Sequence, residues 1–368
     1  MKIAYCYPES LPSSMARSIQ TINTCAALSN EVENVFFYLP AGNYDRSTIF
    51  SYYNINRPNN LKIRFLKKKI GPVSSNSFFN LSLKLALKRD KPDILITRHL
   101  KTAAALIFEA HKIFSNKKRT NKQNMAIEKH FMFAVQGVMC LTKGLKNAIK
   151  NSFQTSGYFS IVPSGTRVRK TMPDKASNCK KKFCITYVGT SRYNWKVLDT
   201  LLKAMIFLPE SIYLEIVGNL DKEYKTKKIC SQLIDQNRLK TIGHLPHNEA
   251  IARLEEADVA VIPNSGREPI GSLYTSPLKL LEAMAAGTAI VASDLPSIRE
   301  VVSKNQAIIV SPDDPYALTE GILKLYDNPK LRLQLPKNAW IKVQDFSWEN
   351  RAKKIVKFAD EVLKRAPV

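Results

Sequence analysis

The sequence predicts an α/β fold built from two successive doubly wound domains, each with a parallel sheet. Short apolar, β-branched runs alternate with longer amphipathic stretches along the chain. At 368 residues the chain is too long for one ordinary core. The alternation restarts after the polar, basic segment TMPDKASNCKKK (171–182), an expected interdomain linker. We therefore expect an N-terminal domain over residues 1–168, a C-terminal domain over 169–345, and a closing helix over 346–368 that crosses back to the first domain.

The first domain alternates apolar runs bounded by turn residues, typical of strands, with amphipathic stretches, typical of helices. The expected strands are Lys2–Tyr7, Val35–Leu39, Ile63–Phe65, Ile94–Thr97, Leu106–Glu109, Val138–Leu141 and Ser160–Val162. The expected helices between them include Arg17–Leu28, Phe78–Arg89, Asn124–Val135 and Gly144–Asn151.

The second domain repeats the pattern. Its expected strands are Phe183–Val188, Tyr213–Val217, Ala260–Ile262, Ala289–Ala292 and Ala307–Val310. Strands this short and apolar are buried under helices on both faces, and ligands of such sheets bind at the carboxyl ends of the strands. With two such domains, the site is expected in a cleft between them. The closing stretch Trp348–Arg365 has apolar residues at helical spacing and is predicted as a helix.

The net charge of +25 favours a polyanionic partner, such as anionic lipid headgroups or phosphorylated substrates. A solvated, lysine-rich surface is the plain alternative. Nucleic acid fits less well, because the basic runs are not interleaved with aromatic residues. The six cysteines are scattered without a Cys-x-x-Cys pair, so we expect neither a metal site nor a cofactor.

The N-terminus MKIAYCYPES lacks the apolar core of a signal peptide, and no apolar stretch is long enough to span a bilayer. We expect a cytoplasmic protein, with peripheral contact to the inner face of the membrane as an option. Asp313 and Asp314 resemble paired acids, but SPDDPYALTEGI is better interpreted as a helix cap. Neither a dinucleotide fingerprint nor a phosphate-binding loop occurs, which argues against redox chemistry and ATP hydrolysis.

The segment SPLKLLEAMAAG (276–287) predicts a sharply bounded helix over 277–286, with Ser276 as N-cap and Gly287 as left-handed C-cap. The helix is almost wholly apolar and therefore buried, so its first N–H groups suit a phosphate. Glu282 lies inside it, and a buried carboxylate needs a partner. Sugar or ribose hydroxyls would serve, and a bond to Lys279 or to the backbone is the alternative.

Residues 263–302 resemble the donor-binding segment of the retaining glycosyltransferases of family 4, a large group with the two-domain GT-B fold. YVGTSRYNWKVLDTLLKA (187–204) is similar to the strand, glycine loop and helix start that open the family's second domain. LEIVGN (214–219), IGHLPHNEAIARLEEADVAVIP (242–263) and VPSGTR (162–167) also match in kind. The resemblance covers most of the second domain and the first only loosely.

The resemblance implies roles for individual residues of the second domain. Glu282 matches the second glutamate of the family's pair, which binds the donor ribose, whereas Tyr274 stands at the first. Lys196 matches the lysine on the diphosphate, and Arg192 is the nearest replacement for an arginine at whose place Thr190 stands. The remaining donor-binding residues implied are Gly189, Thr275, Ser276, Leu278 and Lys279. Without the family, Lys196 is simply a solvated charge.

In the first domain, FEAH (108–111) resembles the strand end where the family often has a histidine that faces the donor sugar, so the resemblance gives His111 that role. A structural histidine is the alternative. Ser14 and Arg17 in the loop PESLPSSMARS (8–18), together with Arg98, are expected on the acceptor side.

The sequence therefore predicts a retaining glycosyltransferase that binds a nucleotide-sugar as substrate and needs no metal. Its acceptor is expected to be a saccharide or a lipid-linked saccharide of a surface polysaccharide or lipopolysaccharide pathway. A hydrolase, phosphorylase or epimerase of the same fold and a non-catalytic partner subunit are the alternatives. The substitutions at Tyr274 and Thr190 keep the non-catalytic alternative open.

Overall fold

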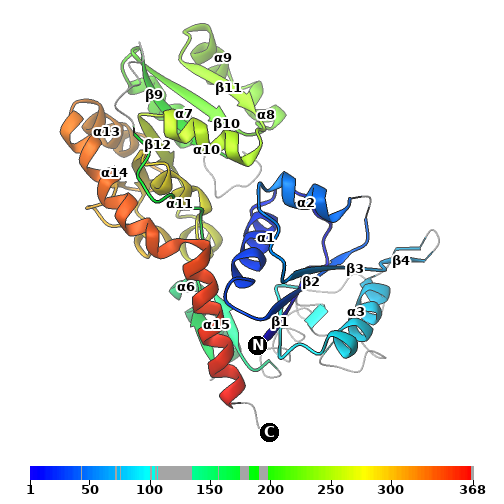
Figure 1. Cartoon of the computed structure of the whole chain (residues 1–368). Coiled ribbons are helices and arrows are strands. Elements are labelled where there is room, and N and C mark those ends of the chain that lie inside the picture. Colours follow the sequence, from blue (N-terminus) through cyan, green and yellow to red (C-terminus); the bar gives the residue numbers. More distant parts are fainter. Residues whose placement is uncertain are drawn as a thin grey trace. The chain divides into compact units, whose positions relative to one another are not determined.

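The computed structural model describes residues 1–42, 44–70, 73–74, 76–99, 102–103, 106, 135–155, 157–174, 182–189 and 198–365. The chain divides into two units (Figure 1). Unit 1 contains residues 1–140, 147–162 and 348–368, and unit 2 contains residues 141–146 and 163–347. The change of unit thus falls after Val162, before the expected boundary at 168. The segment predicted as a linker begins inside unit 2, where Met172 lies against Gly287.

Unit 1 is built on a four-stranded parallel sheet in the order β3-β2-β1-β6. Its strands are β1 (Lys2–Cys6), β2 (Asn34–Pro40), β3 (Leu61–Leu66) and β6 (Ile94–Thr97). Two separate strand pairs lie outside this sheet, namely β4 (Lys69–Ile70) with β5 (Val73–Ser74), and β7 (Val138–Cys140) with β8 (Phe159–Ile161). Its helices are α1 (Ala16–Leu28), α2 (Arg46–Tyr52), α3 (Asn76–Asp90), α6 (Lys143–Phe153, which begins in unit 2) and α15 (Trp348–Arg365). The predicted strand 106–109 and helix 124–135 lie outside the described residues, apart from Leu106 and Val135.

The sheet of unit 1 is covered by helices because its strands are apolar on both faces. Ala4, Cys6 and Phe36 pack with Phe79 and Leu83 of α3. The closing helix α15 lies alongside α1, as Figure 1 shows. The apolar stripe predicted for α15, namely Ile355, Phe358 and Val362, is buried.

Unit 2 is built on a six-stranded parallel sheet in the order β11-β10-β9-β12-β13-β14. Its strands are β9 (Phe183–Val188), β10 (Ile212–Val217), β11 (Leu239–Gly243), β12 (Val259–Ile262), β13 (Ala289–Ser293) and β14 (Ile308–Val310). Its helices are α7 (Leu198–Phe207), α8 (Lys222–Lys225), α9 (Lys228–Asp235), α10 (His247–Glu256), η2 (Ile270–Tyr274), α11 (Leu278–Ala285), α12 (Pro296–Arg299), α13 (Pro315–Tyr326), α14 (Pro329–Val343) and η3 (Gln344–Phe346).

Two apolar cores sandwich this second sheet. In β12, Val259 and Val261 face the core that α7, α9 and α13 cover. The alternate residues, Ala260 and Ile262, face the core that α10, α11 and α14 cover. This alternation is the doubly wound arrangement that the sequence predicts. The expected cleft between the two domains stays a prediction.

Candidate functional site

The strand order of unit 2 reverses between β9 and β12. From β9 the chain runs outward through β10 and β11, and from β12 it runs the other way through β13 and β14. In open α/β sheets, ligands bind outside the carboxyl ends of the strands at such a switch point. Here these ends carry Gly189, after β9, and the segment from Pro263 to α11, after β12.

Gly189, Lys279 and Tyr187 lie together at this switch point. A Cβ atom on Gly189 would stand 2.2 Å from Nζ of Lys279 and 2.7 Å from the hydroxyl of Tyr187. Nζ of Lys279 also lies 5.4 Å from the centre of the Tyr187 ring. The structure thus brings Gly189 and Lys279, both predicted to bind the donor, into one place. A side chain at 189 would displace the lysine ammonium and press against the hydroxyl end of Tyr187.

The Tyr187 hydroxyl is buried and has no hydrogen-bond partner in the part of the chain that the structure describes. Burial raises the pKa of this phenol, so it stays protonated and can donate. Buried polar atoms are almost always paired. A buried hydroxyl that the described residues leave without a partner, beside a lysine ammonium, is therefore a reason to expect an anionic or polar ligand here.

Two further glycines allow the strand ends to approach closely. The N–H of Gly189 donates to the carbonyl oxygen of Val217, at 2.8 Å, and the N–H of Gly218 donates to that of Gly243, at 2.7 Å. Gly218 has a φ of +139°, which side chains rarely adopt. These backbone hydrogen bonds thus hold the carboxyl ends of β9, β10 and β11 close together.

The start of α11 differs from the prediction at its cap. Pro277 is the N-cap residue, whereas the hydroxyl of Ser276 accepts a hydrogen bond from the N–H of Ser164, at 2.9 Å. In return the Ser164 hydroxyl donates to the carbonyl oxygen of Ser276, at 3.3 Å. Ser276 therefore joins two buried segments of unit 2 instead of capping the helix. At the other end of α11, Gly287 has the predicted left-handed φ of +64°.

The remaining residues predicted at this end of α11 are half-buried. Leu278 begins the helix, with Lys279 next to it. Tyr274 ends η2, and the Thr275 hydroxyl donates to the carbonyl oxygen of Ile270.

Glu282 has a protein partner that the sequence did not reveal. It lies in the middle of α11, 8% exposed, and its Oε1 lies 2.9 Å from Nε2 of His247, the first residue of α10. Burial lowers the pKa of His247, but the hydrogen bond and charge of Glu282 outweigh burial and hold it above the usual value.

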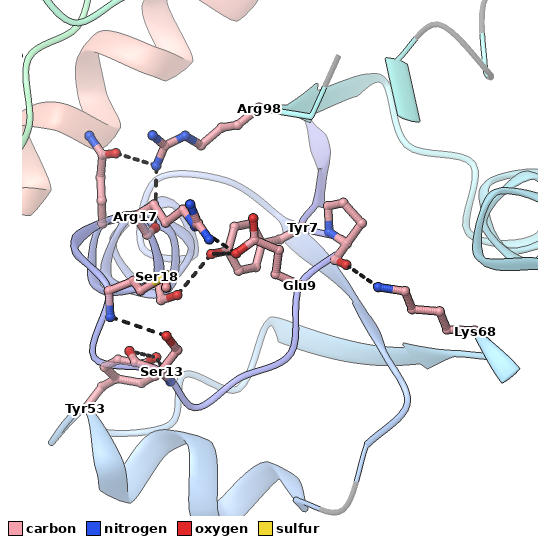
Figure 2. A network of polar contacts seen from close by, with 11 residues as sticks. Tyr7, Glu9, Ser13, Arg17, Ser18, Tyr53, Lys68 and Arg98 are labelled. Carbon is pink, nitrogen blue, oxygen red and sulfur yellow. Dashed lines mark hydrogen bonds and ion pairs between the residues drawn. The ribbon is translucent and has the colours of Figure 1, made fainter. Parts of the chain in front are cut away.

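The loop after β1 forms a polar network in unit 1 (Figure 2). The Tyr7 hydroxyl bonds Oε2 of Glu9 at 3.0 Å and the Ser18 hydroxyl at 2.9 Å. Nε of Arg17 donates to the same Glu9 oxygen, at 2.8 Å. The sheet order of unit 1 reverses between β1 and β6, so this loop and Arg98, after β6, share a switch point.

Arg98 is fixed by this loop. Its Nη1 donates to Oε1 of Gln20 at 2.6 Å and to the carbonyl oxygen of Arg17 at 3.4 Å, as Figure 2 shows. Ser14, Arg17 and Arg98 are all exposed. The three residues predicted on the acceptor side therefore lie on this loop, in the first turn of α1 and after the neighbouring strand β6. Each is accessible to a ligand.

Comparison with known proteins identifies what unit 2 is. The family model for glycosyl transferases group 1 matches residues 168–340, which lie within unit 2. An uncharacterized glycosyltransferase of Methanocaldococcus jannaschii, MJ1069, is 27% identical over 314 residues, which are 82% of this chain and 70% of the relative. Residues 168–340 belong to the group 1 glycosyl transferases.

Two other comparisons agree with this membership. The phosphatidyl-myo-inositol mannosyltransferase of Mycobacterium tuberculosis is 30% identical over 171 residues, 45% of this chain and 43% of that protein. The structure of Anabaena HepE in complex with UDP matches with a TM-score of 0.73 at 16% identity, covering 98% of this chain and all of the other. The fold of this glycosyl transferase is therefore GT-B.

Some predicted site residues of the glycosyl transferase lie outside the described residues, namely His111, Thr190, Arg192 and Lys196. Within the described ranges, no group of His, Cys, Asp and Glu side chains could hold a metal ion. No helix in those ranges is long and apolar enough to cross a bilayer. The five cysteines described are buried.

Sequence reasoning missed two residues of the site. Tyr187 and His247 lie inside segments that resemble the family, but neither was singled out. A tyrosine in a buried strand is normally a core residue, and the chain gives no sign that its hydroxyl lacks a partner. His247 was detectable in principle, since a buried glutamate requires a donor and GHLPHNEA follows a strand end.

Proposed function

We propose that this protein is a retaining glycosyltransferase that moves a sugar from a nucleotide-sugar to a saccharide or lipid-linked saccharide. The observation that carries the proposal is the group Gly189, Lys279 and Tyr187 at the switch point of unit 2. A cation, a buried hydroxyl without a partner among the described residues, and a backbone without Cβ together suit the diphosphate of such a donor. Unit 2 binds the donor, and unit 1 presents the acceptor.

In this proposal the diphosphate lies against Gly189, Lys279 and the first N–H groups of α11, with Lys196 as a second cation. Glu282 accepts hydrogen bonds from the ribose. The UDP bound by the Anabaena neighbour makes UDP-sugars the first donors to test, and the mycobacterial relative makes mannose the next sugar. Thr190 and Tyr274 depart from the family's pattern. In this proposal, other groups therefore contact the sugar.

The proposed reaction keeps the anomeric configuration. The acceptor oxygen bonds the anomeric carbon on the face from which the diphosphate departs, while the bond from that carbon to the phosphate oxygen breaks. The departing oxygen takes the acceptor's proton, so no carboxylate base is needed. Fixed cations and helix-start N–H groups stabilise the developing charge, so the proposal requires no metal ion.

The acceptor side is proposed in unit 1. The exposed residues Ser14, Arg17 and Arg98 lie at its switch point, and their donors suit the hydroxyls and charges of a saccharide or a phosphorylated lipid headgroup. His111 is proposed to hydrogen-bond the transferred sugar.

A face of α3 supports a lipid-linked acceptor. Leu81 and Leu85, one turn apart, are 60% and 63% exposed, while Phe79 and Leu83 of the same helix are buried. Lys88 and Arg89 lie in its last turn. Exposed leucines beside cations are the composition that binds an anionic bilayer surface. We therefore propose peripheral attachment to anionic membranes through α3, consistent with a surface polysaccharide or lipopolysaccharide pathway.

The donor proposal is tested by thermal shift with UDP, GDP, ADP, CMP and their sugar conjugates on the purified chain. Stabilisation by one nucleotide is expected, and Glu282→Ala and Lys279→Ala should each remove most of it. Glu320→Ala, an exposed glutamate on α13, is the matched control and should bind like the wild type. A wild type that no nucleotide stabilises would contradict the proposal.

Once a donor is identified, product analysis tests the reaction. Proton NMR of the new glycosidic linkage should show the donor's anomeric configuration, and EDTA should leave the rate unchanged. Inversion, release of free sugar without transfer, or inhibition by EDTA would each overturn the corresponding part of the proposal.

Membrane attachment is tested by flotation with vesicles of phosphatidylglycerol and phosphatidylcholine. The wild type should float only with the anionic vesicles, and the double variant Leu81→Asp/Leu85→Asp should not float. Leu333→Asp changes an equally exposed leucine on α14 and should float like the wild type. Equal flotation of all variants would exclude α3 as the attachment face.

A further inference from the structure

His247 is placed to control the carboxylate of Glu282. It begins α10, directly after the turn that follows β11, and α10 packs against α11. Its side chain is 40% exposed, whereas that of Glu282 is 10% exposed. The imidazole therefore lies between the buried carboxylate and the surface, at the carboxyl ends of the strands.

The hydrogen bond determines which nitrogen of His247 carries a proton and how the Glu282 carboxylate is oriented. A carboxylate can only accept, so Nε2 of His247 carries the proton whether the ring is neutral or cationic. The bond orients one oxygen of Glu282 and gives a buried charge the donor that it requires.

We infer that His247 is a positioning residue for the nucleotide-sugar: through Glu282 it fixes the acceptor of the ribose hydroxyls, and its protonation sets the affinity for the nucleotide. This inference rests on the proposed donor site. It adds to that site His247, a residue to which the sequence analysis gave no role.

The direction of the pH dependence follows from the charges around His247. The charged groups that act on it are Glu282, from α11, and Arg167, from the segment before β9; Glu249 follows on its own helix. A cationic His247 forms an ion pair with Glu282 and draws its charge away from the ribose hydroxyls. The neutral ring orients the carboxylate without neutralising it, so nucleotide affinity should rise with pH through the titration of His247.

The experiment measures the Kd of UDP-glucose by calorimetry between about pH 6 and about pH 8.5, the range in which a histidine titrates. A nucleotide-sugar is used because its diphosphate has no ionisation in this range. If the panel above selects another base, its sugar conjugate replaces UDP-glucose. Wild type, His247→Gln and His247→Ala are compared, with Asn248→Ala, the exposed neighbour on α10, as control.

The wild type should bind several-fold more tightly at the upper pH. His247→Gln keeps an N–H donor but cannot titrate, so its Kd should approach the wild-type value at high pH and change little with pH. His247→Ala loses both the donor and the titration, so its Kd should change little with pH and should exceed the wild-type Kd at high pH about tenfold, as for the loss of one hydrogen bond to a charged group. The Asn248→Ala control should follow the wild-type profile.

A ligand lacking the ribose hydroxyls separates positioning from a general disturbance of the fold. With 2′,3′-dideoxy-UDP-glucose the His247→Ala variant should bind as well as the wild type, because Glu282 then has no hydroxyl to accept from. An equal loss with both ligands would overturn the inference.

The outcomes distinguish the role of His247 from the proposed donor site on which it rests. Wild-type affinity and pH profile in His247→Ala, or an unchanged pH profile in His247→Gln, would overturn the role of His247 and leave the donor site standing. If the wild type binds no nucleotide at all, the donor site falls and the inference falls with it.

Discussion

A Cβ atom on Gly218 would stand 1.9 Å from the carbonyl oxygen of Gly189. The obstacle is backbone, which cannot move aside as a side chain can, and the two glycines directly follow the adjacent strands β9 and β10 of unit 2. The close approach of these two residues therefore sets the geometry of the candidate donor site.

Gly218→Ala should lower the free energy of unfolding by more than the cost of placing alanine at a positive φ. Gly243→Ala is the matched control, because its φ is +83° but nothing lies within 4 Å of the added atom. The control should cost about 1 kcal/mol and Gly218→Ala clearly more, by urea unfolding. Equal costs would show that the strand ends can separate without penalty.

Tyr187→Phe should stabilise the ligand-free protein by about 1 kcal/mol, because it removes a buried hydroxyl that has no partner among the described residues. The ring, which packs in the core with Ile185 and Leu198, is kept. Differential scanning calorimetry measures the shift. A lower Tm would mean that the hydroxyl is satisfied in solution.

Arg351→Met should destabilise unit 1. The half-buried Arg351 donates to the carbonyl oxygen of Val162 at 2.7 Å and to the Thr24 hydroxyl at 3.0 Å, and desolvation of its guanidinium lowers its pKa to about 10. Methionine keeps much of the packing but leaves these acceptors unpaired, at a cost of about 1–3 kcal/mol. Hydrogen exchange should rise in α1 and β8. Lys353→Met, an exposed change on the same helix, should leave exchange unaltered.

Asp90 should contribute stability that acid removes. Its carboxylate accepts from the Tyr38 hydroxyl at 2.9 Å and from Arg64 and Arg89. Burial raises its pKa, but the hydrogen bonds from Arg89 and Tyr38 and the charges of Arg64 and Arg89 hold it below the ordinary 3.8.

Because the pKa of Asp90 is lower in the folded state, its contribution to stability is complete at pH values above the ordinary carboxyl pKa. The contribution is lost as the pH falls through the lowered pKa of the folded state. Asp90→Asn should therefore be less stable than the wild type at neutral pH, and the difference should shrink below about pH 4. Urea unfolding at several pH values measures it. A difference that does not change with pH would assign the effect to packing.

The sequence predicted most of the strands because their apolar runs are uninterrupted. Strand β9 was predicted with its observed bounds, and β10, β12 and β13 to within one residue at either end. Strand β11 was missed, since Lys240 and Thr241 are exposed and the strand lies at the edge of its sheet. An edge strand carries too short an apolar signal to be distinguished from a turn.

The candidate site was predictable where a local pattern fixes it, and not where distant segments meet. Gly287 as a C-cap and Asp314 as an N-cap follow from neighbouring residues, and both are confirmed. Ser276 was wrongly expected to cap α11, because its actual partner, Ser164, lies 112 residues away. The bond between His247 and Glu282 spans helices that only the folded sheet brings together.

The place of α15 has a consequence for the order in which this protein matures on the ribosome. All of unit 2 is synthesised before Trp348, yet α15 belongs to unit 1 and packs against α1, near the beginning of the chain. Domains usually complete their folding in the order of their synthesis. Here the N-terminal unit finishes last, and its uncovered apolar helix face is a target for chaperones during that delay.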